Sequence, residues 1–313
     1  MKVVIIGRFP DTTKKLLLES FPCVWDVSIV PPEDAEGKLA EAEVLIPEHI
    51  PVDAALLRKA PHLKLVQTGA GYDNIDVSAC TARGIQVCNA AGVNANAVAE
   101  HVMALLLCWY KNIAMLDRYM KSGADENALC YTGSELSGKT LGIAGFGHVG
   151  KAVAEYARAF HMRVLVCSRR PVDTVGVEER DFDSLLRESD VVSLHLPLNE
   201  STRGLIGAAE FAKMKPDALL INTARGALLD EEQLVSALRQ GVIGGACLDV
   251  FEEEPLRADH PLRTLENVIL TPHTAGLPDG VKFHKKRCAF FVSNIEHILK
   301  NEAPECRIND VLT

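Results

Sequence analysis

The sequence predicts an α/β protein built on doubly wound parallel sheets. Short apolar strands alternate with helical patterns along most of the chain, and one strand–helix–strand unit carries a complete G-x-G-x-x-G turn. This alternation is typical of open parallel sheets with helices on both faces. The length of 313 residues favours two domains, and 48% hydrophobic residues suffice for two cores.

Short strands and helices are predicted through the first 90 residues. The strands fall at Val3–Ile6, Val44–Ile46, Leu63–Gln67 and Gln86–Cys88, and the helices near Thr12–Glu19, Val52–Lys59 and Val77–Arg83. The third strand leads into Gly69-Ala70-Gly71, a small loop whose amides could hold an anion. From this feature alone, an ordinary strand-to-helix turn is the better interpretation.

A buried helix and a polar loop are predicted before the glycine turn. Residues Asn96–Lys111 are apolar nearly all round, as in helices packed between layers or domains. Residues Ser122–Gly138 are polar and contain glycine, which indicates a loop.

The glycine turn joins two predicted strands, Leu141–Ala144 and Val164–Cys167, through a helix. Its sequence is Gly145-Phe146-Gly147-His148-Val149-Gly150. In this context the motif favours a dinucleotide site over a turn without a ligand. Gly145 would permit the tight turn, Gly147 the approach of a pyrophosphate and Gly150 close helix packing. The amides and dipole at the helix start attract phosphate.

The end of the second of these strands indicates which dinucleotide binds. An NAD site usually has an acid there, which binds the ribose 2′-hydroxyl. This chain has Ser168-Arg169-Arg170, with a small hydroxyl and two guanidinium groups suited to phosphate. NADP is therefore favoured over NAD, although two solvated surface arginines are the alternative interpretation.

The alternation resumes beyond Arg170. Strands are predicted at Val191–Leu196, Ala218–Asn222, Ala246–Val250 and Val268–Thr271, with a helix from the capping-box-like pair Asp230 and Gln233 to Gln240 and a final helix over Asp279–Lys300.

Three polar residues follow the ends of successive predicted strands in this half of the chain. They are Arg225, Glu254 and His273. Because the carboxyl ends of parallel strands face the ligand crevice, the three side chains are expected to converge. Each alone is weak, since an isolated charge in a loop is usually solvated.

Together these three side chains fit one reaction. A guanidinium can hold a carboxylate through paired hydrogen bonds, and a histidine can pass a proton to an oxygen. A carboxylate beside the histidine orients the ring and favours its protonated form. With a nicotinamide, this set would interconvert 2-keto and 2-hydroxy acids. His195 and His101 are instead expected to be structural.

Composition excludes several classes of protein. The net charge of −9 argues against a general nucleic-acid surface. Nine cysteines without a C-x-x-C pair indicate reduced thiols in a cytoplasmic protein and no metal site. No signal peptide is evident, and the longest apolar run, Val102–Trp109, is too short to span a membrane.

An ordered set of motifs resembles the D-isomer-specific 2-hydroxyacid dehydrogenases, over most of the chain. The segments that carry the resemblance are Leu65–Asp73, Asn94–His101, Gly145–Gly150, His195–Leu198, Asn222–Gly226, Asp249–Pro255 and Thr271–His273. Formate dehydrogenases of this family have glutamine where this chain has Glu254, so formate is not the expected substrate.

The resemblance implies roles for individual residues. Arg225, Glu254 and His273 would form the catalytic triad, and the backbone at Ala70 and Gly71 would hold the substrate carboxylate. Asp249 would contact the nicotinamide carboxamide. Besides the three glycines and Ser168-Arg169-Arg170, the expected cofactor-binding residues are His148, Val149, Leu196, Pro197, Thr202, Thr223, Ala224 and Gly276.

The resemblance also implies a domain plan. A Rossmann-type coenzyme domain, residues 97–278, would be inserted in a flavodoxin-like substrate domain made of residues 1–96 and 279–313. A homodimer is expected, as is usual in the family.

We therefore expect an NADP-dependent reductase of a small 2-keto acid, of the glyoxylate or hydroxypyruvate type. Two alternatives stay open. One is phosphite oxidation, which a related branch of the family performs with similar residues. The other is a cofactor-sensing binding protein like the related corepressors, which retain the triad.

Overall fold

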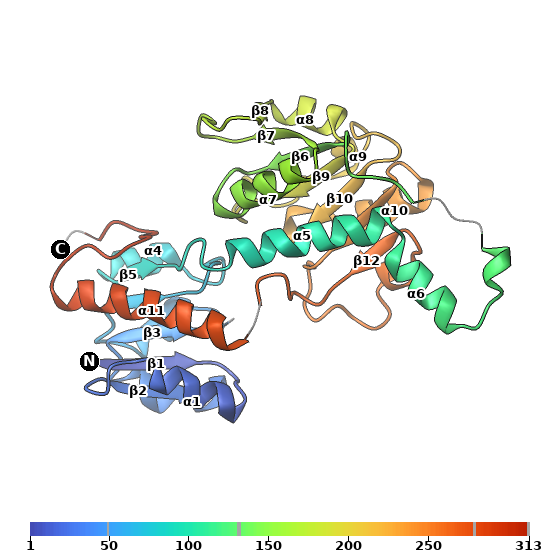
Figure 1. Cartoon of the computed structure of the whole chain (residues 1–313). Coiled ribbons are helices and arrows are strands. Elements are labelled where there is room, and N and C mark those ends of the chain that lie inside the picture. Colours follow the sequence, from blue (N-terminus) through green and yellow to red (C-terminus); the bar gives the residue numbers. More distant parts are fainter. Residues whose placement is uncertain (49, 130–132, 278–279, 312–313) are drawn as a thin grey trace. The chain divides into compact units, whose positions relative to one another are not determined.

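The computed structural model describes residues 1–48, 50–129, 133–277 and 280–311 (Figure 1). The chain divides into two compact units. The first comprises Met1–Asn94 and Leu277–Thr313, and the second comprises Ala95–Gly276. The sequence placed the domain boundaries near residues 96 and 278. The assignment of substrate and coenzyme roles to the two parts stays a prediction.

The first unit contains a five-stranded parallel sheet in the order β2-β1-β3-β4-β5. This is the flavodoxin-like order. Its strands are β1 (Lys2–Ile6), β2 (Asp26–Val30), β3 (Val44–Pro47), β4 (Leu65–Gln67) and β5 (Gln86–Cys88). The edge strand β2 was not predicted, because its half-buried residues lack a clear apolar run.

Helices cover both faces of this sheet. They are α1 (Asp11–Glu19), α2 (Glu36–Leu39), α3 (Ala54–Arg58), α4 (Val77–Ala82) and α11 (Gly280–Leu299), with a 3-10 turn at Pro32–Asp34. Successive residues of β1 point to opposite faces. Val3 and Ile5 therefore pack with α1 and α11, while Val4 and Ile6 pack with α2, α3 and α4.

The second unit contains a seven-stranded parallel sheet in the order β12-β11-β10-β9-β6-β7-β8. Its strands are β6 (Thr140–Ala144), β7 (Arg163–Cys167), β8 (Glu178–Glu179), β9 (Val191–Leu194), β10 (Leu219–Asn222), β11 (Gly245–Leu248) and β12 (Val268–Leu270). From β6 the order proceeds outward in both directions, so the topological switch point lies between β6 and β9. The predicted α/β fold is confirmed.

Helices of the second unit enclose a hydrophobic core on each face of the sheet. The helices are α5 (Ala95–Tyr110), α6 (Ile113–Lys121), α7 (His148–Ala159), α8 (Phe182–Glu188), α9 (Ala208–Phe211) and α10 (Glu231–Gln240), with 3-10 turns at Glu126–Ala128, Gly226–Leu228 and Pro261–Thr264. The apolar helix α5 packs with α7 on one face, and α8, α9 and α10 line the other. Of the predicted loop at 122–138, residues 130–132 lie outside the described residues.

No helix in the described part of the chain has both the length and the apolar character that a membrane span requires.

Candidate active site

The glycine turn follows β6 and opens α7. Gly145 has φ 99°, and a Cβ there would lie 2.4 Å from the carbonyl oxygen of His195. A Cβ on Gly150 would lie 2.2 Å from the carbonyl oxygen of Gly145. At Gly147 the same position faces open space. Two of the three glycines therefore serve the turn and the packing, and the third leaves room for a ligand.

The start of α7 differs from the starts of the neighbouring helices. Asp181 caps α8 by accepting the amide of Ser184 at 2.8 Å, and Asp230 caps α10 by accepting the amide of Gln233 at 3.0 Å. Helix α7 begins after Gly147, and no described side chain caps it. Its first amides and its dipole therefore remain available to an anion beside exposed His148 and half-buried Val149.

The end of β7 carries the predicted 2′-phosphate residues. The half-buried Ser168 accepts the amide of Arg170 on its hydroxyl at 3.3 Å. Arg169 and Arg170 are exposed, and neither guanidinium forms an ion pair with another described residue. Two cationic groups thus lie at the end of the strand that follows the glycine-turn helix.

The loop after β9 is shaped by its own polar groups. The Thr202 hydroxyl donates to the carbonyl of Pro197 at 2.7 Å and accepts the amide of Asn199 at 2.9 Å. Just before it, Nε2 of His195 lies 2.9 Å from the Ser193 hydroxyl. Burial lowers the pKa of His195 to about 4, so its ring is neutral at neutral pH. The half-buried Leu196 and more exposed Pro197 lie between these two anchors.

The loop after β10 presents Arg225. The buried Asn222 side chain accepts the amide of Ala224 at 3.0 Å and donates to the carbonyl of Arg225 at 2.8 Å. The Arg225 guanidinium donates to the carbonyl of Ala224 at 2.7 Å. Beside it, the hydroxyl oxygen of Thr223 is buried and has no hydrogen-bond partner among the described residues. Such an atom is usually satisfied by a ligand or a water.

Glu254 and His273 form a short pair. Oε2 of Glu254 lies 2.6 Å from Nδ1 of His273, and Oε1 accepts the amide of Phe251 at 3.0 Å. The two side chains are 34% and 39% exposed, so the pair can meet a ligand. His273 has a left-handed backbone, φ 54°, which is uncommon outside glycine.

Asp249 holds the loop that carries His273. It is fully buried, and its carboxylate accepts the Thr271 hydroxyl at 2.5 Å and the amides of Thr274 and Ala275 at 2.9 and 2.8 Å. His101 reaches the Thr271 hydroxyl at 3.1 Å. Sequence reasoning assigned Asp249 to the cofactor and missed these loop bonds, because their donors lie 22–26 residues away along the chain.

The loops that carry Arg225 and Glu254 touch directly. A Cβ on Gly226 would lie 1.9 Å from the carbonyl carbon of Phe251 and 2.4 Å from the amide nitrogen of Glu252. Only glycine permits this contact. The second unit therefore contains the three loops of the predicted triad together with the glycine turn and Gly276. Sequence reasoning missed Glu231 and His260 beside them, since neither follows a strand end.

The two other predicted substrate-binding residues belong to the first unit. Ala70 and Gly71 follow β4, and the carbonyl of Ala70 accepts the side-chain amide of Asn89 at 2.8 Å. A Cβ on the adjacent Gly69 would face open space. The described residues contain no group of three His, Cys, Asp or Glu arranged to hold a metal ion.

This arrangement supports three chemical tasks. An uncapped helix start after a glycine turn can bind a pyrophosphate. A guanidinium can hold a carboxylate, and a histidine paired with a carboxylate can exchange a proton with an oxygen.

Comparisons with known proteins agree with this chemistry. Residues 103–275 match the family model described as "D-isomer specific 2-hydroxyacid dehydrogenase, NAD binding domain". The glyoxylate reductase of Thermococcus litoralis is 39% identical and covers 100% of this chain and 98% of its own. That of Aeropyrum pernix is 44% identical over 85% of this chain and 84% of its own.

A solved structure extends the likeness to the whole fold. It is the NADPH-dependent glyoxylate/hydroxypyruvate reductase of Sinorhizobium meliloti, in complex with NADP and malonate. It has a TM-score of 0.87 and 26% identity, over 98% of this chain and 96% of its own.

Proposed function

The chain belongs to the D-isomer specific 2-hydroxyacid dehydrogenase family, and from this premise we propose that it is an NADP-dependent reductase of glyoxylate or hydroxypyruvate. The observation that carries the proposal is the 2.6 Å pair of Glu254 and His273 on loops beside Arg225. The glyoxylate reductases among its relatives support the choice of substrate.

The residues of the second unit fit a nicotinamide dinucleotide. Open space at Gly147, the uncapped start of α7 and the unpartnered Thr223 hydroxyl all lie among the predicted cofactor-binding residues. When bound, the reduced nicotinamide supplies the hydride for the substrate's C2 carbon. Arg169 and Arg170 would hold the 2′-phosphate of NADP.

The chain's own residues would complete the reduction. Arg225 binds the substrate carboxylate through paired hydrogen bonds. Because Nδ1 of His273 faces Glu254, Nε2 is the atom that delivers a proton to the carbonyl oxygen. The Glu254 carboxylate orients the ring through Nδ1. In the oxidation direction, Nε2 accepts the hydroxyl proton. The substrate-binding role of the Ala70 and Gly71 amides in the first unit stays a prediction from the sequence.

Helix α6 supports a homodimer as part of the proposal. None of its residues is buried within the unit, and Ile113 and Met120, which lie two turns apart on one side of the helix, are exposed. Figure 1 shows α6 continuing from the end of α5. An apolar helix face of this kind is suited to a second copy of the chain.

A cytoplasmic setting is also part of the proposal. The described cysteines are all free thiols. Burial raises the pKa of Cys80 and Cys288 to about 11, so these thiols are unreactive. Such thiols are typical of proteins from a reducing compartment.

A panel of keto acids with both reduced cofactors tests the proposal. A charge-assisted hydrogen bond contributes about 1.5–3 kcal/mol, so two such bonds, after solvent screening, should favour NADPH by roughly 10²-fold in kcat/KM. Replacing Ser168 by Asp and both arginines by Gln should reverse the preference.

The matched control replaces two exposed arginines elsewhere, Arg83→Gln and Arg239→Gln, and should leave the preference unchanged. A wild-type preference for NADH would contradict the cofactor proposal. Turnover of phosphite, or of no keto acid at all, would contradict the substrate proposal.

A further inference from the structure

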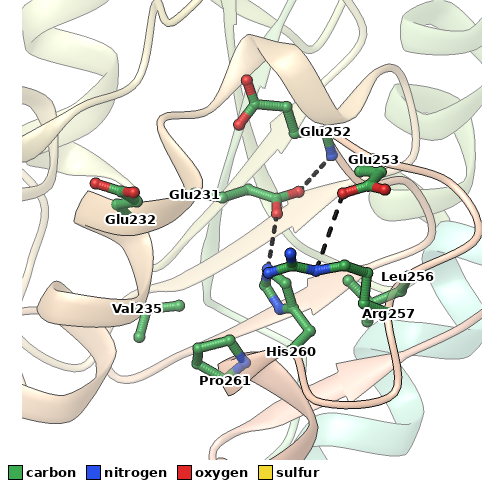
Figure 2. A pocket seen from close by; sticks show the side chains of 9 residues that line it. All are labelled: Glu231, Glu232, Val235, Glu252, Glu253, Leu256, Arg257, His260 and Pro261. Atoms are coloured by element: carbon green, nitrogen blue, oxygen red, sulfur yellow. Dashed lines mark hydrogen bonds and ion pairs between the residues drawn. The ribbon is translucent and has the colours of Figure 1, made fainter.

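A second carboxylate–histidine pair contacts the loop that carries Glu254. Glu231, the first residue of α10, is only 7% exposed. Its Oε1 accepts the amide of Glu252 at 2.5 Å, and its Oε2 lies 3.3 Å from Nε2 of His260 (Figure 2). Both residues line a cavity of about 580 Å³, whose wall also includes Glu232 and Arg257.

The orientation of His260 fixes the second oxygen of Glu231. The amide of Leu262 donates to Nδ1 of His260 at 3.3 Å. Since Nδ1 is therefore an acceptor, the ring proton lies on Nε2, the atom that faces Oε2 of Glu231 at 3.3 Å. One carboxylate oxygen thus lies beside the ring nitrogen, and the other accepts the Glu252 amide.

The amide that Glu231 accepts belongs to the peptide between Phe251 and Glu252. The same peptide rests directly against Gly226, next to Arg225. The Phe251 amide donates to Glu254, whose other oxygen meets His273. Glu252 and Glu254 are two residues apart on the same loop. A shift of the Glu252 amide should therefore also move the Glu254 carboxylate.

Because Glu231 is buried, its carboxylate depends on the polar groups around it for stabilisation. Desolvation raises the pKa of its carboxyl, and the hydrogen bond from the Glu252 amide opposes this rise. A buried carboxylate is unfavourable unless it is hydrogen-bonded or paired with a polar group. Here Oε1 of Glu231 accepts the Glu252 amide, and Oε2 lies beside Nε2 of His260.

We propose that Glu231 is a positioning residue, which holds the 251–254 loop through the Glu252 amide and so sets the Glu254 carboxylate against His273. The inference rests on the proposed function, in which that pair handles the proton. Glu231 itself touches neither member of the pair. Its role is to fix the backbone from which Glu254 projects.

Three variants of the full-length chain separate this role from general stability. Glu231→Leu removes the acceptor and should lower kcat by about 10–100-fold, since misplacing a reacting group by about 1 Å has effects of this size. Glu231→Gln keeps an acceptor for the Glu252 amide and should retain kcat within about threefold. Glu232→Leu, on the same cavity wall, is the matched control and should behave as wild type.

A spectroscopic readout follows the pair directly, without substrate. A proton held between Nδ1 of His273 and Glu254 should give a strongly downfield resonance, assigned by its loss in His273→Gln. The resonance should disappear in Glu231→Leu and persist in Glu231→Gln and Glu232→Leu, with the dissociation constant of NADPH unchanged. If Glu231→Leu does not fold, Glu231→Asp withdraws the carboxylate by one methylene and should weaken the resonance.

Two results would overturn the proposal. One is a wild-type resonance in Glu231→Leu or, where that variant does not fold, in Glu231→Asp. The other is loss of the resonance in Glu231→Gln as well, which would show that charge rather than the amide bond is required. Failure of the proposed function is distinguishable, because wild-type protein would then turn over no keto acid while the resonance test still reports on the loop.

Discussion

The two carboxylate–histidine pairs both contact the 251–254 loop and differ in exposure and in partners. Glu254 and His273 are 2.6 Å apart and about one-third exposed. Glu231 and His260 are 3.3 Å apart, with side chains 9% and 16% exposed. The ring of His260 also accepts a backbone amide through Nδ1. A pair that exchanges a proton with a ligand must be accessible to that ligand. A buried pair bonded to the backbone can only hold that backbone in place.

The largest effect should come from the exposed pair. Substituting His273→Gln removes the proton donor and should lower kcat by roughly 10²–10⁴-fold, the usual contribution of a general acid. The corresponding change in the buried pair, His260→Gln, should lower kcat by less than about tenfold, because the Glu231 bond to the Glu252 amide remains. Steady-state rates with glyoxylate and NADPH measure both.

Fluorescence titration with NADPH provides the control for this contrast, because neither histidine is expected to set cofactor affinity. Near-normal turnover in His273→Gln, or equal losses in the two variants, would remove the distinction between the pairs.

A smaller effect should follow from changing the anion-binding residue beside the exposed pair. Arg225→Lys keeps the charge but cannot make a planar paired contact with a carboxylate. The two hydrogen bonds become one, so kcat/KM should fall by about 10–100-fold, through a lower kcat and a higher KM. Michaelis constants for glyoxylate provide the measurement, and the exposed Arg239→Lys is the control. Wild-type kinetics in Arg225→Lys would show that a point charge is sufficient.

The smallest effect concerns His195, whose ring lies beside the Ser193 hydroxyl and not beside a carboxylate. Burial lowers the pKa of His195 to about 4, whereas an unfolded histidine titrates near 6.5. As the pH falls below about 6.5, the unfolded chain binds the proton first, and the folded state loses stability progressively until about pH 4. The loss should reach roughly 1–3 kcal/mol.

His195→Gln should therefore show a smaller fall in Tm between pH 7 and pH 5 than the wild type. Thermal unfolding followed by circular dichroism at the two pH values measures this, and the surface variant His62→Gln is the control. Identical pH dependence in wild type and His195→Gln would show that this ring does not limit acid stability.

The elements that follow local rules were predictable. The glycine turn and the strand-end positions of Arg225, Glu254 and His273 follow from motif spacing and from the rule that parallel strands end at one edge. The edge strand β2 was missed because it is only half-buried and its residues give no clear apolar signal.

The pair of Glu231 and His260 follows no local sequence pattern that would have predicted it. Glu231 follows the helix cap Asp230 and reads as an ordinary acidic residue in a first helical turn, where acids are common. Its partners, the Glu252 amide and His260, lie more than twenty residues further along the chain. Only the packing of α10 against the 251–254 loop gives this carboxylate a role different from that of its exposed neighbour Glu232.

The amino-acid sequence by itself determined the alternating parallel sheets, the turn at Gly145–Gly150 and the chemical types placed after the strands, because these depend on side-chain periodicity and on short spacings. The tertiary structure alone decided which oxygen meets which donor. Gly226 must lie against the Phe251–Glu252 peptide, and Asp249 must be buried beneath the His273 loop, before the pair is set at 2.6 Å. Hydrogen bonds form over about 3 Å and depend on direction, so long-range packing, which no local pattern encodes, fixes them.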